Sequence, residues 1–247
     1  MYNRQMCRII SLLAFFTVFY LGQTTITNAM PITATTWLVA DESGRIIQSE
    51  NISPQRSIAS ITKLMTVMVV LDARQDLSEK IGPYTRFETI QMALVKSDNH
   101  SAQMLCEYYP NGKDACIRAM NTKARELGMD NTNYVEPTGL SVFNVSTATD
   151  LVKLVITAKD YPEIVLASKS STIKIKMKRK WLVFRNTNPI IGQQHNFIVS
   201  KTGYIRASGG CIVMMLDTEI GRRIVVVLGS KNTHTRIPEA KFIAENY

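Results

Sequence analysis

Three short motifs in this chain combine residue types that can build a nucleophilic site. In the first, Ser60-Ile61-Thr62-Lys63, a hydroxyl and an amine stand three residues apart. Residues at this spacing share one face of a helix, so the amine of Lys63 can contact the hydroxyl of Ser60. A serine hydroxyl becomes a strong nucleophile when a base removes its proton. The apolar residues Leu64, Met65 and Val67 predict a buried lysine, and burial favours the neutral form that can act as this base.

The second motif, Ser97-Asp98-Asn99, falls between two predicted helices. In such a loop a hydroxyl can relay a proton and an amide can hold a substrate amide. The third motif, Lys201-Thr202-Gly203, stands at the end of a predicted strand. Its lysine is a fixed cation for a carboxylate, its threonine is a hydroxyl donor, and its glycine allows backbone to approach closely.

Each motif taken alone is weak evidence. A chain of this length holds roughly one Ser-x-x-Lys by chance, and residues 171–174 are a second copy. Alternation in that segment predicts a strand with the serine and the lysine on opposite faces. Ser-x-Asn recurs at 49–51 and 230–232, where a turn or a helix cap is the ordinary explanation. Lys-Thr-Gly occurs once.

The elements that must position these motifs follow from periodicity and turn residues. Helices are predicted over 60–72, 86–96, 101–109, 113–127, 147–159 and 235–246. Strands are predicted over 35–40, 45–48, 173–178, 197–201, 211–216 and 223–228. Strands near both ends with helices between them predict an α+β fold, in which a helical lobe is inserted into an antiparallel sheet.

The N-terminus predicts export. Arg4 and Arg8 precede an apolar run over 9–22, and small residues lead up to Ala29. This pattern is typical of a secretory signal over residues 1–29, with an uncleaved anchor or a buried helix as the alternative. The run is short for a bilayer span. We therefore expect one domain over 30–247, periplasmic, without a transmembrane span after cleavage, and at most loosely associated with membrane or wall.

Composition limits the partners. Lysine and arginine number 29 against 20 acidic residues, which gives a net charge of +9. A basic surface attracts nucleic acid, anionic lipid or an acidic wall polymer, or simply keeps the protein soluble. Basic residues are not interleaved with a series of aromatic residues, so nucleic acid is not the expected partner. No Cys-x-x-Cys or His-Glu-x-x-His spacing occurs, and neither a metal nor another cofactor is expected.

Three cysteines remain after the leader: Cys106, Cys116 and Cys211. Cys106 and Cys116 can pair across the turn-like residues 109–112 in an oxidising compartment. Three buried thiols that act as small hydrophobic side chains are the alternative, and the one we favour.

In this order, behind a secretory leader, the three motifs match the signature of penicillin-binding proteins and class A β-lactamases. The sequence resembles the low-molecular-mass penicillin-binding proteins of the D-alanyl-D-alanine carboxypeptidase family, and most closely its periplasmic endopeptidase branch. The resemblance runs from about Thr36 to the C-terminus. It is carried by residues 58–65, 135–141, 144–148, 185–188, 201–203 and 209–211.

The resemblance implies a DD-peptidase/β-lactamase-like fold and a serine D-Ala-D-Ala endopeptidase that binds peptidoglycan peptides and β-lactams. It implies that Ser60 is acylated by the D-alanine carbonyl, that Lys63 is the general base and that Ser97 passes the proton to the leaving amine. Backbone N–H groups of Ser60 and of the strand after Gly203 would form the oxyanion hole. The implied substrate-binding residues are Asn99, Lys201, Thr202 and Gly203.

The sequence also departs from the family pattern. The segment between Lys63 and Ser97 looks short, Ile205 replaces a usual threonine, and Gly210 stands where histidine is expected. We expect no extra C-terminal domain of the kind that the carboxypeptidase branch carries, and this expectation favours endopeptidase activity. The alternatives are a carboxypeptidase, a β-lactamase that uses Glu136, and a non-hydrolysing sensor. A Ser-His-Asp hydrolase is disfavoured because no Gly-x-Ser-x-Gly occurs. The sequence leaves the oligomeric state open.

Overall fold

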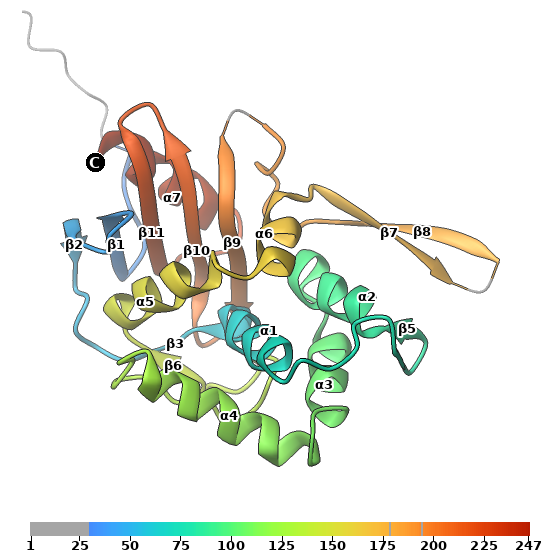
Figure 1. Cartoon of the computed structure of the whole chain (residues 1–247). Coiled ribbons are helices and arrows are strands. Elements are labelled where there is room, and N and C mark those ends of the chain that lie inside the picture. Colours follow the sequence, from blue (N-terminus) through green and yellow to red (C-terminus); the bar gives the residue numbers. More distant parts are fainter. Residues whose placement is uncertain (1–29, 178, 194) are drawn as a thin grey trace, which may run out of the picture.

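The computed structural model describes residues 30–177, 179–193 and 195–247, so the predicted leader over 1–29 lies outside the described residues. The centre of the molecule is a five-stranded antiparallel sheet in the order β2-β1-β11-β10-β9 (Figure 1). Its strands are β1 (Thr36–Asp41), β2 (Ile46–Glu50), β9 (Asn196–Ile205), β10 (Gly209–Thr218) and β11 (Gly221–Ser230). Segments from both sides of the helical region therefore form one sheet, as the sequence predicts.

Both faces of this sheet are covered, which explains its continuous apolar runs. In β10, Ile212 and Met214 face the helix α7 (Arg236–Asn246), whereas Val213 and Met215 face the helical lobe. Side chains alternate between the two faces of a strand, so a strand buried on both sides has no polar positions in its middle.

The helical lobe is built around α1 (Thr62–Asp72), nine of whose eleven residues are buried. A helix that is apolar on all sides belongs in the interior. It contacts three of the other helices, α3, α4 and α5, and Figure 1 shows it between the sheet and α4. The lobe also holds α2 (Arg86–Gln91), α3 (Asn99–Glu107), α4 (Gly112–Glu126), α5 (Ala148–Ala158) and α6 (Pro162–Lys169). None of the helices in the described residues is both long and apolar enough to cross a membrane.

Short two-stranded ladders complete the fold. They pair β3 (Arg56–Ser57) with β6 (Val145–Ser146), and β4 (Lys80–Ile81) with β5 (Tyr84–Thr85). A longer hairpin of β7 (Thr172–Met177) and β8 (Lys180–Arg185) projects from the body of the molecule (Figure 1).

Several elements differ from the prediction. The predicted helix over 86–96 is α2 followed by a π-helical turn, η2 (Met92–Lys96). Strand β9 continues to Ile205, so Lys201-Thr202-Gly203 lies inside the strand rather than at its end. Helix α6 and strand β8 were not predicted, although Pro162 at the first turn of α6 is a recognised start signal.

The favoured interpretation of three free thiols is wrong. Cys106 in α3 and Cys116 in α4 form a disulfide, with Cα atoms 5.3 Å apart. Asn111 and Gly112 adopt left-handed conformations that reverse the chain between these helices and bring the two cysteines together. Cys211 is a buried free thiol in β10.

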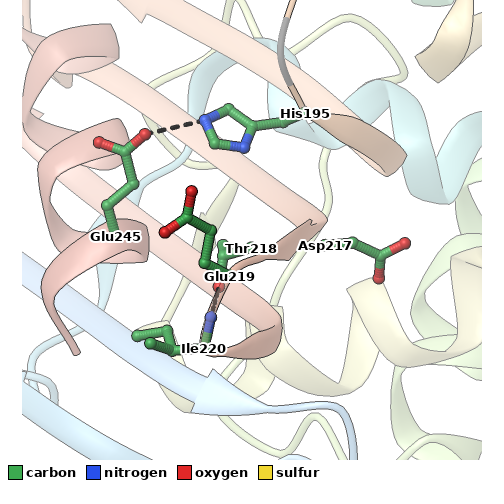
Figure 2. Close-up of a pocket in the computed structure, with 6 residues that line it drawn as sticks. All are labelled: His195, Asp217, Thr218, Glu219, Ile220 and Glu245. Atoms are coloured by element: carbon green, nitrogen blue, oxygen red, sulfur yellow. Dashed lines mark hydrogen bonds and ion pairs between the residues drawn. The ribbon is translucent and has the colours of Figure 1, made fainter.

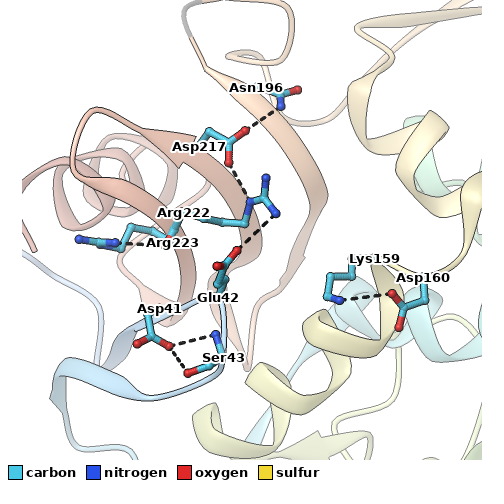
Figure 3. A network of polar contacts seen from close by, with 9 residues as sticks. All are labelled: Asp41, Glu42, Ser43, Lys159, Asp160, Asn196, Asp217, Arg222 and Arg223. Atoms are coloured by element: carbon cyan, nitrogen blue, oxygen red, sulfur yellow. Dashed lines mark hydrogen bonds and ion pairs between the residues drawn. The ribbon is translucent and has the colours of Figure 1, made fainter.

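At one end of the sheet, exposed charges connect two turns (Figure 3). Arg222 contacts Asp217 at 2.8 Å and Glu42 at 3.5 Å, and so links the β10–β11 turn to the β1–β2 turn. Such solvent-exposed pairs contribute at most about 1 kcal/mol each, and stability comes chiefly from the two covered faces of the sheet.

Candidate active site

Ser60 lies where the helical lobe meets β9. It is the middle residue of a short 3-10 turn, η1 (Ala59–Ile61), that leads directly into α1. Ala59 has φ +46°, a left-handed conformation that is rare for a residue with a side chain. Strained backbone of this kind persists where the surrounding structure enforces it, and it concentrates at functional sites.

Lys63 is completely buried, one helical turn from Ser60. Its Nζ lies 2.7 Å from Ser60 Oγ, 2.8 Å from Asn99 Oδ1 and 2.6 Å from the carbonyl oxygen of Thr138. Burial lowers the pKa of Lys63 from 10.5 to about 7, against the opposing influence of the negative charges of Glu136 and Asp98. A substantial part of Lys63 is therefore neutral near physiological pH.

The three partners of Lys63 differ in what they can donate. The amide oxygen of Asn99 and the carbonyl oxygen of Thr138 are acceptors only, so they take the two N–H groups of a neutral amine. The remaining lone pair is left for the partner that carries a proton, the hydroxyl of Ser60. Neutral Lys63 is thus held as a base aimed at Ser60.

The second motif, Ser97-Asp98-Asn99, joins η2 to α3 and contacts both lysines of the site. The π-helical turn η2 ends at Ser97, whose φ of +60° is left-handed, and Asp98 then caps α3 by accepting from Ser101 N at 2.8 Å. This tight reversal places Ser97 Oγ 2.8 Å from the Nζ of Lys201. It also brings Asn99, the first residue of α3, onto Lys63.

Lys201 is buried in β9 and donates to Ser97 Oγ and to the carbonyl oxygen of Thr202. Burial holds the pKa of Lys201 well below its ordinary value, and the nearby charges of Lys63 and Arg236 lower it further. A carboxylate placed beside Lys201 would oppose these effects and favour its charged form.

Gly203 explains why the third motif needs a glycine. A Cβ at this position would lie 2.9 Å from Ser60 N and 3.0 Å from the Cβ of Ala59. The strand can therefore approach the nucleophile turn only without a side chain. Next to it, Thr202 donates to the hydroxyl of Thr187 at 2.6 Å.

The structure brings together all the residues selected from the sequence: Ser60, Lys63, Ser97, Asn99, Lys201, Thr202 and Gly203. The chance copies lie elsewhere. Lys174 is exposed in β7, which begins one residue after Ser171. Ser49 lies in β2, and Ser230 ends β11, where its hydroxyl bonds Thr235.

Two supporting residues had no assigned role in the predicted peptidase site. The carboxylate of Glu136 accepts from the backbone N–H groups of Thr138 at 2.7 Å and Gly139 at 2.6 Å. It thereby fixes the turn whose carbonyl group holds Lys63. Gly139 has φ +83°, and any Cβ there would overlap the carbonyl oxygen of Ala59. The segment Glu136-Pro137-Thr138-Gly139 was noted in the sequence, but the contacts between the Glu136 carboxylate and this turn could not be predicted from it.

Arg236 is the other residue that sequence reasoning missed. From the start of α7 it donates to the carbonyl oxygen of Gly203 at 2.6 Å, which places a buried cation behind the third motif. Helix α7 and the turn before it explain why Gly210 stands where the family pattern has histidine. A Cβ on Gly210 would overlap the carbonyl oxygen of Asn232 and lie 3.2 Å from the Cβ of Arg236, so no histidine fits there.

A separate pocket of about 600 Å³ lies at the other end of the sheet, lined by His195, residues 217–220 and Glu245 (Figure 2). The register pairs Asp217 with Asn196 there, whereas Cys211 pairs with Gly203 beside Ser60. His195 contacts Glu245 at 2.9 Å. The hydroxyl of Thr218 donates to the carbonyl oxygen of Gly221, and the described residues that line this pocket form no serine–base pair comparable to Ser60 and Lys63.

Comparison with known proteins agrees with this geometry. The family profile described as D-alanyl-D-alanine carboxypeptidase matches residues 23–86 and 79–232. The chain is 39% identical to a D-alanyl-D-alanine endopeptidase of Escherichia coli over 219 residues, covering 79% of this chain and 71% of the relative. It is 37% identical to a D-alanyl-D-alanine endopeptidase of Pseudomonas aeruginosa over 227 residues, covering 82% and 73%.

Solved structures share the fold. A DD-transpeptidase of Streptomyces superposes with a TM-score of 0.81 at 23% identity, covering 87% of this chain and 96% of that one. A penicillin-binding protein of Listeria monocytogenes in an ampicillin-bound form gives a TM-score of 0.77 at 23% identity, covering 86% and 96%. The family match and the identity to the endopeptidases cover most of the chain. It therefore belongs to the D-alanyl-D-alanine carboxypeptidase family and is a serine DD-peptidase.

Proposed function

We propose that this protein is a D-alanyl-D-alanine endopeptidase that cleaves peptide cross-links of peptidoglycan through an acyl-enzyme on Ser60. The observation that carries the proposal is the 2.7 Å contact between Ser60 Oγ and Lys63 Nζ, together with the burial that lowers the pKa of Lys63 to about 7. The same nucleophile would open the ring of a β-lactam and remain acylated.

In the first step, neutral Lys63 accepts the hydroxyl proton of Ser60 while Ser60 Oγ bonds to the carbonyl carbon of a D-alanine residue. The carbonyl oxygen becomes an oxyanion. The backbone N–H of Ser60 and that of Tyr204, the residue after Gly203, are the donors that we assign to it. The close approach of Gly203 to Ser60 N supports this placement of the two backbones.

In the second step, the carbon–nitrogen bond breaks and the leaving amine needs a proton. Ser97 is the residue that we assign to this transfer, because its hydroxyl contacts Lys201 at 2.8 Å and can be reprotonated from there. The acyl-ester on Ser60 remains. The proton that Lys63 took from Ser60 replaces the one lost from Ser97 and Lys201, so Lys63 is neutral again. Lys63 then deprotonates a water molecule, which attacks the ester carbonyl. The ester carbon–oxygen bond breaks, and Lys63 returns the proton to Ser60 Oγ.

Substrate binding is assigned to the outer edge of β9. Within the described residues this strand is the last of the sheet, so an extended peptide can pair with its free edge beside Ser60. Lys201 and Thr202 supply a positive charge and a hydroxyl for a substrate carboxylate, and Asn99 completes the opposite wall. These roles match those expected from the sequence.

The choice of endopeptidase over carboxypeptidase rests on the relatives. Those named endopeptidases are 39%, 37% and 30% identical to this chain, whereas two named carboxypeptidases are 24% identical. The test is a rate comparison by liquid chromatography, with a cross-linked muropeptide dimer and a monomeric pentapeptide as substrates. Faster cleavage of the dimer is expected, and faster cleavage of the pentapeptide would assign the protein to the carboxypeptidases.

The structure disfavours a β-lactamase that uses Glu136 to hold a hydrolytic water. Glu136 Oε1 accepts from Gly139 N and from Asn144 Nδ2, and Oε2 accepts from the backbone and hydroxyl of Thr138. Both oxygens are therefore occupied. A non-hydrolysing sensor would share this geometry, and it would form the acyl-enzyme without releasing cleaved peptide in the same assay.

We also propose a periplasmic location. The leader-like residues 1–29 support export, and the Cys106–Cys116 disulfide suits an oxidising compartment. Cell fractionation with antibody detection tests this, and protein confined to the cytosolic fraction would contradict it.

A further inference from the structure

The positive charge of this chain is concentrated in one segment. Residues 164–216 contain no aspartate or glutamate and nine lysines and arginines, equal to the net charge of +9 for the whole chain. Seven of the nine fall within residues 169–185, which include the projecting β7–β8 hairpin. Charge this concentrated requires an explanation beyond general solubility.

The two faces of the hairpin differ. Paired residues of an antiparallel ladder point to the same face. Ile173 pairs with Phe184, and this inner face packs with Ile175 onto Tyr84 and Met92.

The opposite face, which we call the outer face, consists of Lys174, Lys176, Trp181, Val183 and Arg185. Lys174 pairs with Val183 and Lys176 with Trp181, and the exposed fractions of Trp181 and Val183 are 64% and 57%. In the described part of the chain, Lys174, Lys176 and Arg185 form no salt bridge. The outer face therefore presents uncompensated cations beside bare apolar side chains.

This surface leads directly to the active site. Two residues after β8 ends at Arg185, Thr187 N donates to the carbonyl oxygen of Val95, and the hydroxyl of Thr187 accepts from Thr202. The chain that leaves the outer face thus contacts Thr202 of the third motif, two residues after the hairpin ends.

We propose that the outer face is a docking surface for the peptidoglycan polymer, which holds an intact strand while a cross-link enters the site. The inference rests on the proposed function. Stem peptides carry free carboxylates that complement Lys174 and Lys176, and an indole ring such as that of Trp181 packs against the C–H face of a sugar ring.

An anionic membrane is the competing partner, and the hairpin fits it less well. Interfacial insertion requires a continuous apolar face that enters the acyl region. The projecting end of the hairpin carries Arg179 and Lys180 instead, and the outer face exposes only Trp181 and Val183 as large apolar groups. The lysines of the outer face can attract carboxylates, and the ring of Trp181 offers a flat contact. Both interactions suit a hydrated polymer better than the interior of a membrane.

The test uses the full chain carrying Ser60→Ala, so that bound strands are not cleaved. Co-sedimentation with purified sacculi is compared for this protein, for Lys174→Glu/Lys176→Glu and for Trp181→Ala. The matched control, Arg118→Glu/Lys231→Glu, makes the same charge change at exposed positions elsewhere. We expect the lysine pair to lose at least about tenfold in affinity and most of its salt dependence. Trp181→Ala should lose affinity and keep its salt dependence, and the control should bind normally.

Cleavage rates on sacculi and on soluble dimers distinguish a failure of the docking surface from a failure of the proposed function. With Ser60 restored, the lysine variant should cleave sacculi more slowly but cleave soluble dimers and react with penicillin at rates within about twofold of the unaltered protein. An equal loss in the control, or unchanged sacculus binding, would overturn the docking surface. Loss of binding to phosphatidylglycerol-containing vesicles with sacculus binding intact would also overturn it, in favour of a membrane. Failure of the unaltered protein to cleave dimers would instead refute the proposed function.

Discussion

The protonation state of Lys63 gives the most quantitative prediction. A base must be neutral to accept a proton, so the rate of acylation should follow the neutral fraction of Lys63. With a pKa of about 7 this fraction is about a tenth at pH 6, a half at pH 7 and nine tenths at pH 8. A lysine at its ordinary value of 10.5 would be neutral in only about one molecule in three thousand at pH 7, so burial raises the reactive population roughly a thousandfold.

The assay is the second-order rate constant for acylation by a fluorescent penicillin, measured by stopped flow across this pH range. We expect a rise of nearly tenfold from pH 6 to pH 8 that levels off above. Asp98→Asn is the matched variant, because asparagine also caps a helix. Removing the negative charge of Asp98, which raises the pKa of Lys63, should move the midpoint to lower pH. A rate flat with pH, a midpoint near 10, or a shift to higher pH in the variant would refute the reasoning.

Three further predictions follow from other contacts. Gly139→Ala places a Cβ on the carbonyl oxygen of Ala59 and should displace the turn that carries Ser60 by about 1 Å. Penicillin acylation should then be about a hundredfold slower. An unchanged acylation rate would contradict this close packing. Lys201→Ala should slow acylation by free-acid substrates about ten- to a hundredfold and affect amidated substrates less, and equal losses would exclude the carboxylate role. Replacing Cys106 and Cys116 by serine should lower the free energy of unfolding in urea by roughly 2.5 kcal/mol while acylation is retained, and unchanged stability would show that the bond is absent.

The sheet and the three motifs were predictable because their signals are local. Continuous apolar runs over 211–216 and 223–228 identify buried strands, and Ser60-x-x-Lys63 needs only one helical turn to bring its two groups together. The α+β arrangement followed from the order of these elements. That Ser97 and Lys201, 104 residues apart, belong to one site was expected through the family resemblance rather than from spacing, and their 2.8 Å contact was not predicted.

The remaining features depend on contacts that a single sequence does not show. The Cys106–Cys116 bond depends on left-handed backbone at Asn111 and Gly112 that reverses the chain between two helices. Arg236 lies 33 residues after Gly203 in the sequence and contacts it because α7 packs on the sheet at that point. Strand β8 was missed although its apolar run over 181–184 is typical of a strand, and most of its residues are exposed.

Acylation of Ser60 Oγ, on which the proposed mechanism depends, can be observed directly. The protein is labelled with penicillin, digested with trypsin and analysed by tandem mass spectrometry, and cleavage after Arg56 and Lys63 isolates residues 57–63. We expect the adduct on Ser60 of this peptide, and no adduct in Ser60→Ala. An adduct on Ser57 or on another peptide, or full labelling of Ser60→Ala, would contradict it.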